Sequence, residues 1–277
     1  MTTPALSVGL RSRGRHYPYP PVDPSQWPKN RWGSLDPESL PDGHQFFPSV
    51  TNILSVIDKP ALKYWAAEMA LREMYDTGAL PLDVDAAIAA HKMACNRKAS
   101  ERADAGTRAH TLAERLTSDL PLPKSISDED EAYADAFMAF WSDHSPEPFE
   151  VEATMYGDGY AGTPDLVGKV QVGFSREIAV VDYKTRGVRD EKKIARYGLL
   201  YDENRMQLAA LAHCNYVAKP NDDGWDLLAA PLMTAAMGVV LFPDGSYATE
   251  PIDDLGRWYA AFQGALKLWE GLNDAAA

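Results

Sequence analysis

The sequence has few cysteines and no long apolar run, and both absences exclude classes of protein. Of its 277 residues only Cys95 and Cys214 are cysteine. Two thiols form neither a disulfide framework nor a four-cysteine metal site, so a reducing, cytoplasmic setting fits best. No apolar segment approaches the roughly 18 residues of a membrane span, and the first residues lack the apolar core and cleavage site of a signal peptide. We therefore expect no membrane partner.

The sequence also lacks an excess of positive charge. Its 27 basic residues are outnumbered by 40 acidic ones, which gives a net charge of −13 and, taken alone, argues against a nucleic-acid partner. The distribution of charge matters more, because salt screens charges beyond about 10 Å. Acids concentrate in 128–131, 222–226 and 250–254, whereas bases concentrate in 92–115 and 184–196. The basic stretches are either solvated helix faces or surfaces for a polyanion.

Periodicity divides the chain into an arm and one domain. Proline, glycine and aromatic residues fill residues 1–48, which predicts an irregular arm with little regular structure. Apolar spacing then predicts helices, followed from Phe149 by segments with the alternation of strands. The helices are expected in 49–77 (with a break before Pro60), 82–94, 97–117, 128–144, 190–217 and 253–271. This order predicts a single α/β domain over 49–277, with an antiparallel start to its sheet.

One predicted hairpin carries acids among core-type residues. The stretch "GTPDLVGKVQVGFSREIAVVDYKT" spans residues 162–185. If its turn centres on Gly173 and Phe174, paired residue numbers add to about 347, and Asp165 lies opposite Asp182 on the same face of the sheet. Lys184 shares that face because it lies two residues from Asp182. The cluster is either a surface salt-bridge group or a site in which a divalent cation relieves repulsion between two carboxylates.

Further motifs surround this hairpin in a fixed order. Pro164 and Asp165 are followed, after sixteen residues, by Asp182-Tyr183-Lys184. Upstream, "AGTRAHTLAE" at 105–114 has the form Gly-x-x-His-x-x-x-Glu, and downstream "NRMQLAALAH" at 204–213 is a helical segment that carries a glutamine. With "VVDYKT" and the lead-in at 49–70, these motifs resemble the PD-(D/E)XK nuclease superfamily, in its RecB-like, phage-exonuclease branch. The resemblance covers roughly residues 49–250.

The resemblance implies a fold and a set of roles. The fold is α/β with a restriction-endonuclease-like core, in which a mixed β-sheet with an antiparallel meander is flanked by helices. His110, Asp165 and Asp182 match the ligands of a Mg²⁺ or Mn²⁺ ion, joined by the backbone carbonyl of Tyr183. The catalytic group it implies consists of Lys184, which orients the attacking water or stabilises negative charge, with Asp165, Asp182 and Gln207.

Some positions stay open or depart from the pattern. Glu152 is either a water-mediated ligand or part of a solvent-facing alternation. Leu211 stands where relatives usually have a tyrosine, which removes any DNA contact from that side chain. Some relatives carry an iron–sulfur cluster, which two cysteines cannot hold. The basic residues expected to meet DNA are Arg108, Arg186, Lys192 and Lys193.

The function that the resemblance implies is metal-dependent hydrolysis of DNA phosphodiester bonds, leaving 5′-phosphates. No base-reading module is evident, which favours an exonuclease acting on single- or double-stranded ends in phage recombination or replication. Relatives of this kind often work beside a single-strand annealing protein, in the cytoplasm of the host cell, and some form ring-shaped homo-oligomers. The alternatives are a structure-selective or restriction-type endonuclease, and a catalytically inactive DNA-binding or interaction protein.

Overall fold

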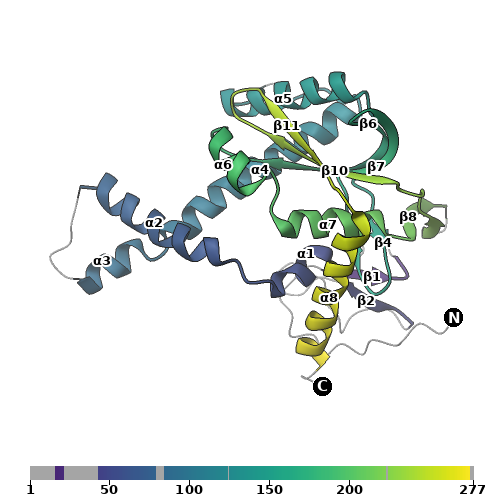
Figure 1. Cartoon of the computed structure of the whole chain (residues 1–277), viewed down its shortest axis with the longest axis horizontal. Coiled ribbons are helices and arrows are strands. Elements are labelled where there is room, and N and C mark those ends of the chain that lie inside the picture. The colour runs from purple at the N-terminus through teal and green to yellow at the C-terminus, as the bar shows by residue number, and fades with distance from the viewer. Residues whose placement is uncertain (1–15, 22–42, 79–83, 124, 223, 275–277) are drawn as a thin grey trace.

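The structure is a computed structural model that describes residues 16–21, 43–78, 84–123, 125–222 and 224–274. Its helices are α1 (Val50–Ile53), a 3₁₀ turn (Leu54–Val56), α2 (Pro60–Asp76), α3 (Val84–His91), α4 (Ala94–Thr117), α5 (Asp128–His144), α6 (Glu191–Tyr197), α7 (Asp202–Ala212) and α8 (Leu255–Asp274). Figure 1 shows α2, α3 and the start of α4 extending away from a body that contains the sheets.

A five-stranded mixed sheet forms the centre of the body. Its strands, in spatial order, are β11 (Tyr247–Pro251), β10 (Ala235–Leu241), β7 (Ser175–Thr185), β6 (Leu166–Val172) and β3 (Glu147–Val151). β7 and β10 are parallel and the other neighbours are antiparallel. The predicted α/β class, with a mixed sheet flanked by helices, is confirmed.

The register of the β6–β7 hairpin is the predicted one. Leu166 pairs with Val181 and Val172 pairs with Ser175, which leaves Gly173 and Phe174 as the turn. Gly173 has a φ of 59°, a left-handed conformation that glycine adopts without strain. Asp165 and Asp182 are next in this series, one residue beyond the last pair of the ladder.

Helices cover the two faces of the sheet and form two cores. Val181 and Tyr183 pack with Phe137 of α5 in one core, whereas Val180 packs with Leu208 of α7 in the other. Because side chains alternate along a strand, Asp182 and Lys184 point to the same side as Val180, towards α7. Ser127 caps α5 by accepting a hydrogen bond from the Asp130 N–H at 3.1 Å.

A second sheet was missing from the sequence-based expectation. It has the order β5 (Ala161–Gly162), β4 (Met155–Tyr156), β8 (Tyr216–Asn221) and β9 (Gly224–Ala229). The predicted single strand from Phe149 is therefore split between the two sheets. The predicted helix over 190–217 is also divided, because α6 ends at Tyr197, before Gly198 with its φ of 80°, and α7 ends before β8.

The described part of the predicted irregular arm contains two short strands. β1 (His16–Tyr19) and β2 (Gln45–Pro48) pair as an antiparallel two-stranded sheet. Tyr17 and Phe47 pack with Tyr156 in a small aromatic core, because large rings bury much apolar area on a single short strand. The rest of the predicted arm lies outside the described residues. Among the described helices, none is long and apolar enough to cross a bilayer.

Candidate metal centre

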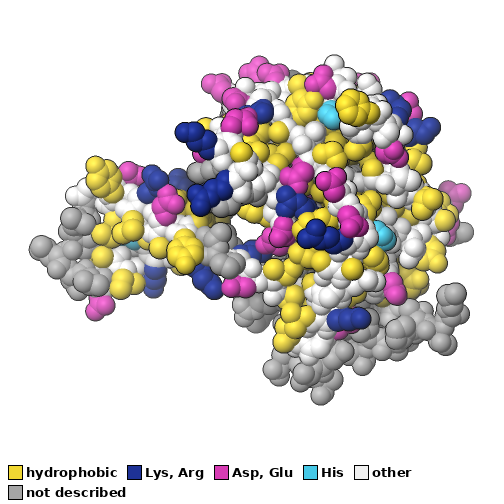
Figure 2. Space-filling view, viewed as in Figure 1, with side chains coloured by type: hydrophobic (Ala, Val, Ile, Leu, Met, Phe, Trp, Pro, Cys, Tyr) yellow, Lys and Arg dark blue, Asp and Glu magenta, His cyan; other side chains and the backbone are white. Residues whose placement is uncertain are grey.

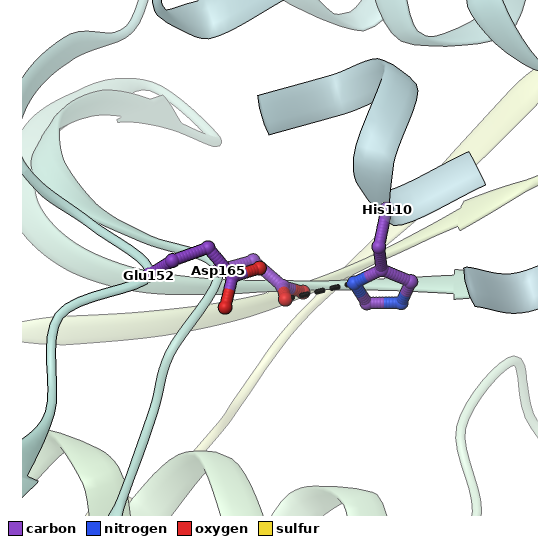
Figure 3. A group of neighbouring side chains, drawn as sticks. All are labelled: His110, Glu152 and Asp165. Atoms are coloured by element: carbon purple, nitrogen blue, oxygen red, sulfur yellow. Dashed lines mark hydrogen bonds and ion pairs between the residues drawn. The ribbon is translucent and has the colours of Figure 1, made fainter. Parts of the chain in front are cut away.

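Three potential ligands converge from separate elements. His110 of α4, Asp165 before β6 and Glu152 after β3 each offer one ligand atom, and these atoms lie within 4.8 Å of one another. Figure 3 shows the two carboxyl groups side by side with the imidazole facing them. Ligands on opposite sides of an ion with bonds of about 2.1 Å lie about 4 Å apart, so a side-chain shift of under ~1 Å closes the group around an ion.

Local backbone structure places each of the three. Glu152 has a φ of 49°, and its N–H donates to the carbonyl of Asp165 at 3.3 Å. This left-handed residue ends β3 and turns the Glu152 side chain out of the strand alternation. α4 approaches the end of β7 closely, because Gly106 has no side chain: a Cβ there would lie 3.4 Å from Thr185 Oγ1. His110 follows one turn later.

Asp165 connects the helix and the hairpin. One of its carboxylate oxygens lies 2.9 Å from His110 Nδ1, and the other accepts a hydrogen bond from the backbone N–H of Tyr183. A carboxylate fixed at both oxygens holds one orientation without further support. The contact with Tyr183 also brings Asp165 beside the strand that carries Asp182.

Asp182 and Lys184 form a second group next to the first. The Lys184 ammonium contacts one oxygen of Asp182, and Gln207 Nε2 donates to the other at 3.1 Å. Asp182 is thus held by a lysine of its own strand and by a glutamine of α7. It does not belong to the three groups that converge within 4.8 Å, and its predicted role as a ligand stays a prediction, as does that of the Tyr183 carbonyl.

The electrostatics show an excess of negative charge. Burial lowers the pKa of His110, but the hydrogen bond to Asp165 and the charges of Asp165 and Asp182 raise that pKa above its usual value. Burial likewise lowers the pKa of Lys184, and Asp182 and Asp165 raise it overall. The carboxylates around His110 and Lys184 therefore favour the protonated form of each group.

The raised pKa values of two carboxyl groups show the same excess of negative charge. Burial, followed by the charge of Asp165, raises the pKa of Glu152 to about 7. Burial raises the pKa of Asp182, and repulsion by Asp165 adds to this, against the opposing effect of Lys184. Carboxyl groups whose pKa values are raised by burial and mutual repulsion fit a site in which a divalent cation would relieve the excess negative charge.

The side chain of Tyr183 points to the opposite side of the sheet from Asp182 and Lys184, and its ring meets the His110 ring edge-on with centroids 6.5 Å apart. Its ring packs edge-on against Phe137 and Phe140, with centroids 5.3 and 5.9 Å away. Burial raises the pKa of its phenol well above the usual value, and in the part of the chain that the structure describes the hydroxyl has no hydrogen-bond partner. Tyr183 thus contributes to the site through its backbone.

The cations predicted to meet DNA have different surroundings. Arg108 is engaged by two acids of α5, with its Nε 2.9 Å from Asp130 Oδ1 and an Nη 3.2 Å from Glu129. Arg186 lies just after β7, and Lys192 is exposed on α6. The side chain of Lys193 lies outside the described residues. The acids at 128–131 gave a signal in the sequence for the pairing of Arg108, but the pattern did not say which base they would meet.

Comparison with known proteins gives little further guidance. No protein-family model matches the chain, and no curated protein matches it either. Among solved structures, the chain is similar to an alkaline exonuclease from Laribacter hongkongensis, with a TM-score of 0.32 and 17% identity, over 61% of this chain and 83% of that one. At that TM-score the similarity assigns neither a family nor an activity.

Proposed function

We propose that this protein is a metal-dependent deoxyribonuclease that hydrolyses DNA from its ends. The observation that carries this proposal is the convergence of His110, Glu152 and Asp165 beside the Asp182–Lys184 pair. One nitrogen and several carboxylate oxygens suit a hard or borderline divalent ion such as Mg²⁺ or Mn²⁺. A partly buried lysine next to such an ion fits hydrolysis of a phosphodiester better than a structural metal site.

The ion would be held by His110, Asp165 and Glu152, with Asp182 and the Tyr183 carbonyl as further ligands. When bound, it would supply a Lewis acid for the scissile phosphate and a water of lowered pKa. The other roles in the reaction would belong to Lys184 and Gln207.

Lys184 has the position and charge for a direct role. Its raised pKa keeps the amine protonated at neutral pH, so it can donate hydrogen bonds to the attacking water or to a phosphate oxygen that gains negative charge. Gln207 keeps the Asp182 carboxylate oriented through its 3.1 Å hydrogen bond. Gln207 thus acts on the chemistry by positioning Asp182.

DNA would be attracted locally, in spite of the net charge of −13. Cations close to the centre act within a Debye length, whereas distant acids are screened. Lys192 and Arg186 are the described candidates for contacts to the phosphate backbone, and Arg108 is already neutralised by Asp130 and Glu129. An annealing-protein partner and a homo-oligomer stay predictions from the sequence.

End-labelled linear DNA and covalently closed circular DNA test the proposal when each is incubated with Mg²⁺, Mn²⁺ or a chelator. We expect metal-dependent release of nucleotides from the linear molecule and an intact circle. Cutting of the circle would favour the endonuclease alternative. DNA binding without cleavage under every condition would favour the inactive binding protein and overturn the proposal.

A further inference from the structure

Beside the candidate centre, a cation and an exposed aromatic ring lie in direct contact. The Arg186 guanidinium lies 5.0 Å from the centroid of the Tyr201 ring, and Tyr201 is 61% exposed. We propose that Arg186 and Tyr201 form a nucleotide subsite, in which the guanidinium binds the phosphate next to the scissile one and the ring stacks on that nucleotide's base. This inference rests on the proposed nuclease function.

Arg186 continues the line of the catalytic strand. Its N–H donates to the carbonyl of Leu241 at 3.1 Å, which extends the β7–β10 ladder by one residue beyond Thr185. Asp182, Lys184 and Arg186 therefore alternate onto one side of the sheet, with about 6.6 Å between successive members. This step is comparable to the distance between neighbouring phosphates of a stretched strand, so a strand that places one phosphate at Lys184 brings the next to Arg186.

The charge of Arg186 is available for a ligand. Arg108, Arg189 and Arg205 each form ion pairs with carboxylates. Within the described residues no carboxylate forms an ion pair with Arg186, although acids outnumber bases by 40 to 27 in the sequence. The ring contact uses no carboxylate oxygen, and the N–H groups of a guanidinium match the oxygens of a phosphate.

The exposed ring stands on a fixed stretch of backbone. Glu250 accepts hydrogen bonds from the N–H groups of Leu199 and Leu200, both at 3.0 Å. The Leu200 side chain is buried over Gly238, where an added Cβ would lie 2.4 Å from it. The Tyr201 N–H donates to Asn204 at 3.2 Å at the start of α7. The backbone on both sides of Tyr201 is therefore held in place, while its ring is exposed to solvent. An exposed ring on a fixed backbone is the arrangement of a preorganised stacking platform.

The same contacts place this ring near the chemistry. Gly238 is the register partner of Asp182 on the neighbouring strand. Leu200, which covers Gly238, thus lies next to Asp182, and Tyr201 follows it directly. α7 then runs from Tyr201 to Gln207, whose side chain reaches Asp182.

Binding of a labelled single strand tests the subsite, measured by fluorescence anisotropy in the Lys184→Ala background so that the strand stays intact. The probe is compared with a strand whose terminal nucleotides lack bases. We expect Tyr201→Ala to weaken binding of the normal strand about tenfold and to leave binding of the abasic strand unchanged. Tyr201→Phe keeps the ring and should bind like the parent. Tyr216, 45% exposed on β8, provides the matched control: Tyr216→Ala should not alter either affinity.

The salt dependence separates the two members of the pair. Arg186→Gln should weaken binding of both strands and reduce the slope of log affinity against log salt by about 0.7, the value for one phosphate of a single strand. An unchanged affinity in Tyr201→Ala, or an equal loss for normal and abasic strands, would overturn the stacking role. If the wild-type protein cleaves linear DNA and Tyr201→Ala has no effect on binding, the subsite alone is wrong. If the wild-type protein neither binds nor cleaves DNA, the proposed function is wrong.

Discussion

Two lysine–carboxylate pairs in this protein have similar exposure and different neighbours. The Lys184 and Asp182 side chains are 29% and 5% exposed, and those of Lys219 on β8 and Glu150 on β3 are 37% and 10% exposed. The Lys184–Asp182 pair has three further polar neighbours: Gln207 donates a hydrogen bond to Asp182, and the charges of Asp165 and His110 act on the pair. In the described chain, Lys219 and Glu150 have only each other as ion-pair partners. The proposed centre therefore rests on the convergence of several charged groups from different elements, and not on the partial burial of a charge pair.

The largest expected effect comes from replacing Lys184 and Lys219 in turn, which tests whether the two pairs differ in function. Lys184→Ala should lower the cleavage rate about 100- to 1,000-fold, because it removes a donor directed at developing negative charge, with DNA binding retained. Lys219→Ala should stay within about threefold of the wild type, as expected for the loss of a pair near the surface. Single-turnover digestion of linear DNA measures both. Equal losses in the two variants would mean that Lys184 acts only through stability.

A second test of this comparison uses His110 and the metal concentration that cleavage requires. His110→Ala should raise the metal concentration needed for half-maximal cleavage about 10- to 100-fold, because one potential ligand is lost. His213→Ala is the control, since His213 lies at the end of α7 and stacks on Tyr259 at 4.0 Å. Titration with Mn²⁺ measures the effect, and binding of Mn²⁺ followed by thermal shift gives a readout independent of activity. An unaltered Mn²⁺ requirement in His110→Ala would remove His110 from the ligand set.

The hairpins that carry the two lysines should also differ in stability. Val167 on β6 is fully buried, whereas Leu228 on β9 is 50% exposed. Val167→Ala should cost about 2 kcal/mol of unfolding free energy, because it leaves a cavity in the core. Leu228→Ala should cost less than about 0.5 kcal/mol. Urea unfolding measures both, and comparable costs would contradict the view that the β6–β7 hairpin is the more rigid platform.

The smallest expected effect concerns the Arg108–Asp130 ion pair, which lies outside the candidate metal centre. Burial raises the pKa of Asp130, but hydrogen bonds from Arg108 and Ser127 lower it below the usual value. A lowered folded-state pKa contributes stability above the ordinary pKa of the carboxyl, and this contribution is lost as the pH falls through the folded value. Asp130→Asn should therefore lower the Tm slightly at pH 7. The difference from wild type should shrink as the pH falls below the ordinary pKa of the carboxyl and through its lowered folded value, and a difference that grows on acidification would reverse the assignment.

The part of the fold predicted from the sequence is the part governed by local rules. The Ser127 cap, the extent of α5 and the β6–β7 register follow from side-chain spacing and from a turn at Gly173. The β8–β9 hairpin was missed, and β4 was assigned to the wrong sheet. The left-handed residue Glu152 ends β3 and sends the chain to the second sheet, and a positive φ at a glutamate has no signal in the alternation of apolar and polar residues.

The residues of the candidate centre also fall into those that local rules predicted and those that only packing placed. Asp165, Asp182 and Lys184 could be placed together because two residues on one strand and an opposed residue on its partner share a face. Whether Glu152 joined them was open in the sequence, since it depends on the backbone after β3. The pairing of Arg108 with α5 was not predicted, because nothing local connects α4 and α5 at that point.

The sequence by itself determined the alternation, the turn and hence the set of side chains on one face of β6 and β7, because these depend on contacts between residues close along the chain. Only the tertiary structure decided that α4 brings His110 to Asp165, that α7 brings Gln207 to Asp182, and that Leu200 over Gly238 fixes Tyr201 beside Arg186. Those contacts join segments whose separation in sequence leaves their relative placement to packing, and packing is a property of the whole core.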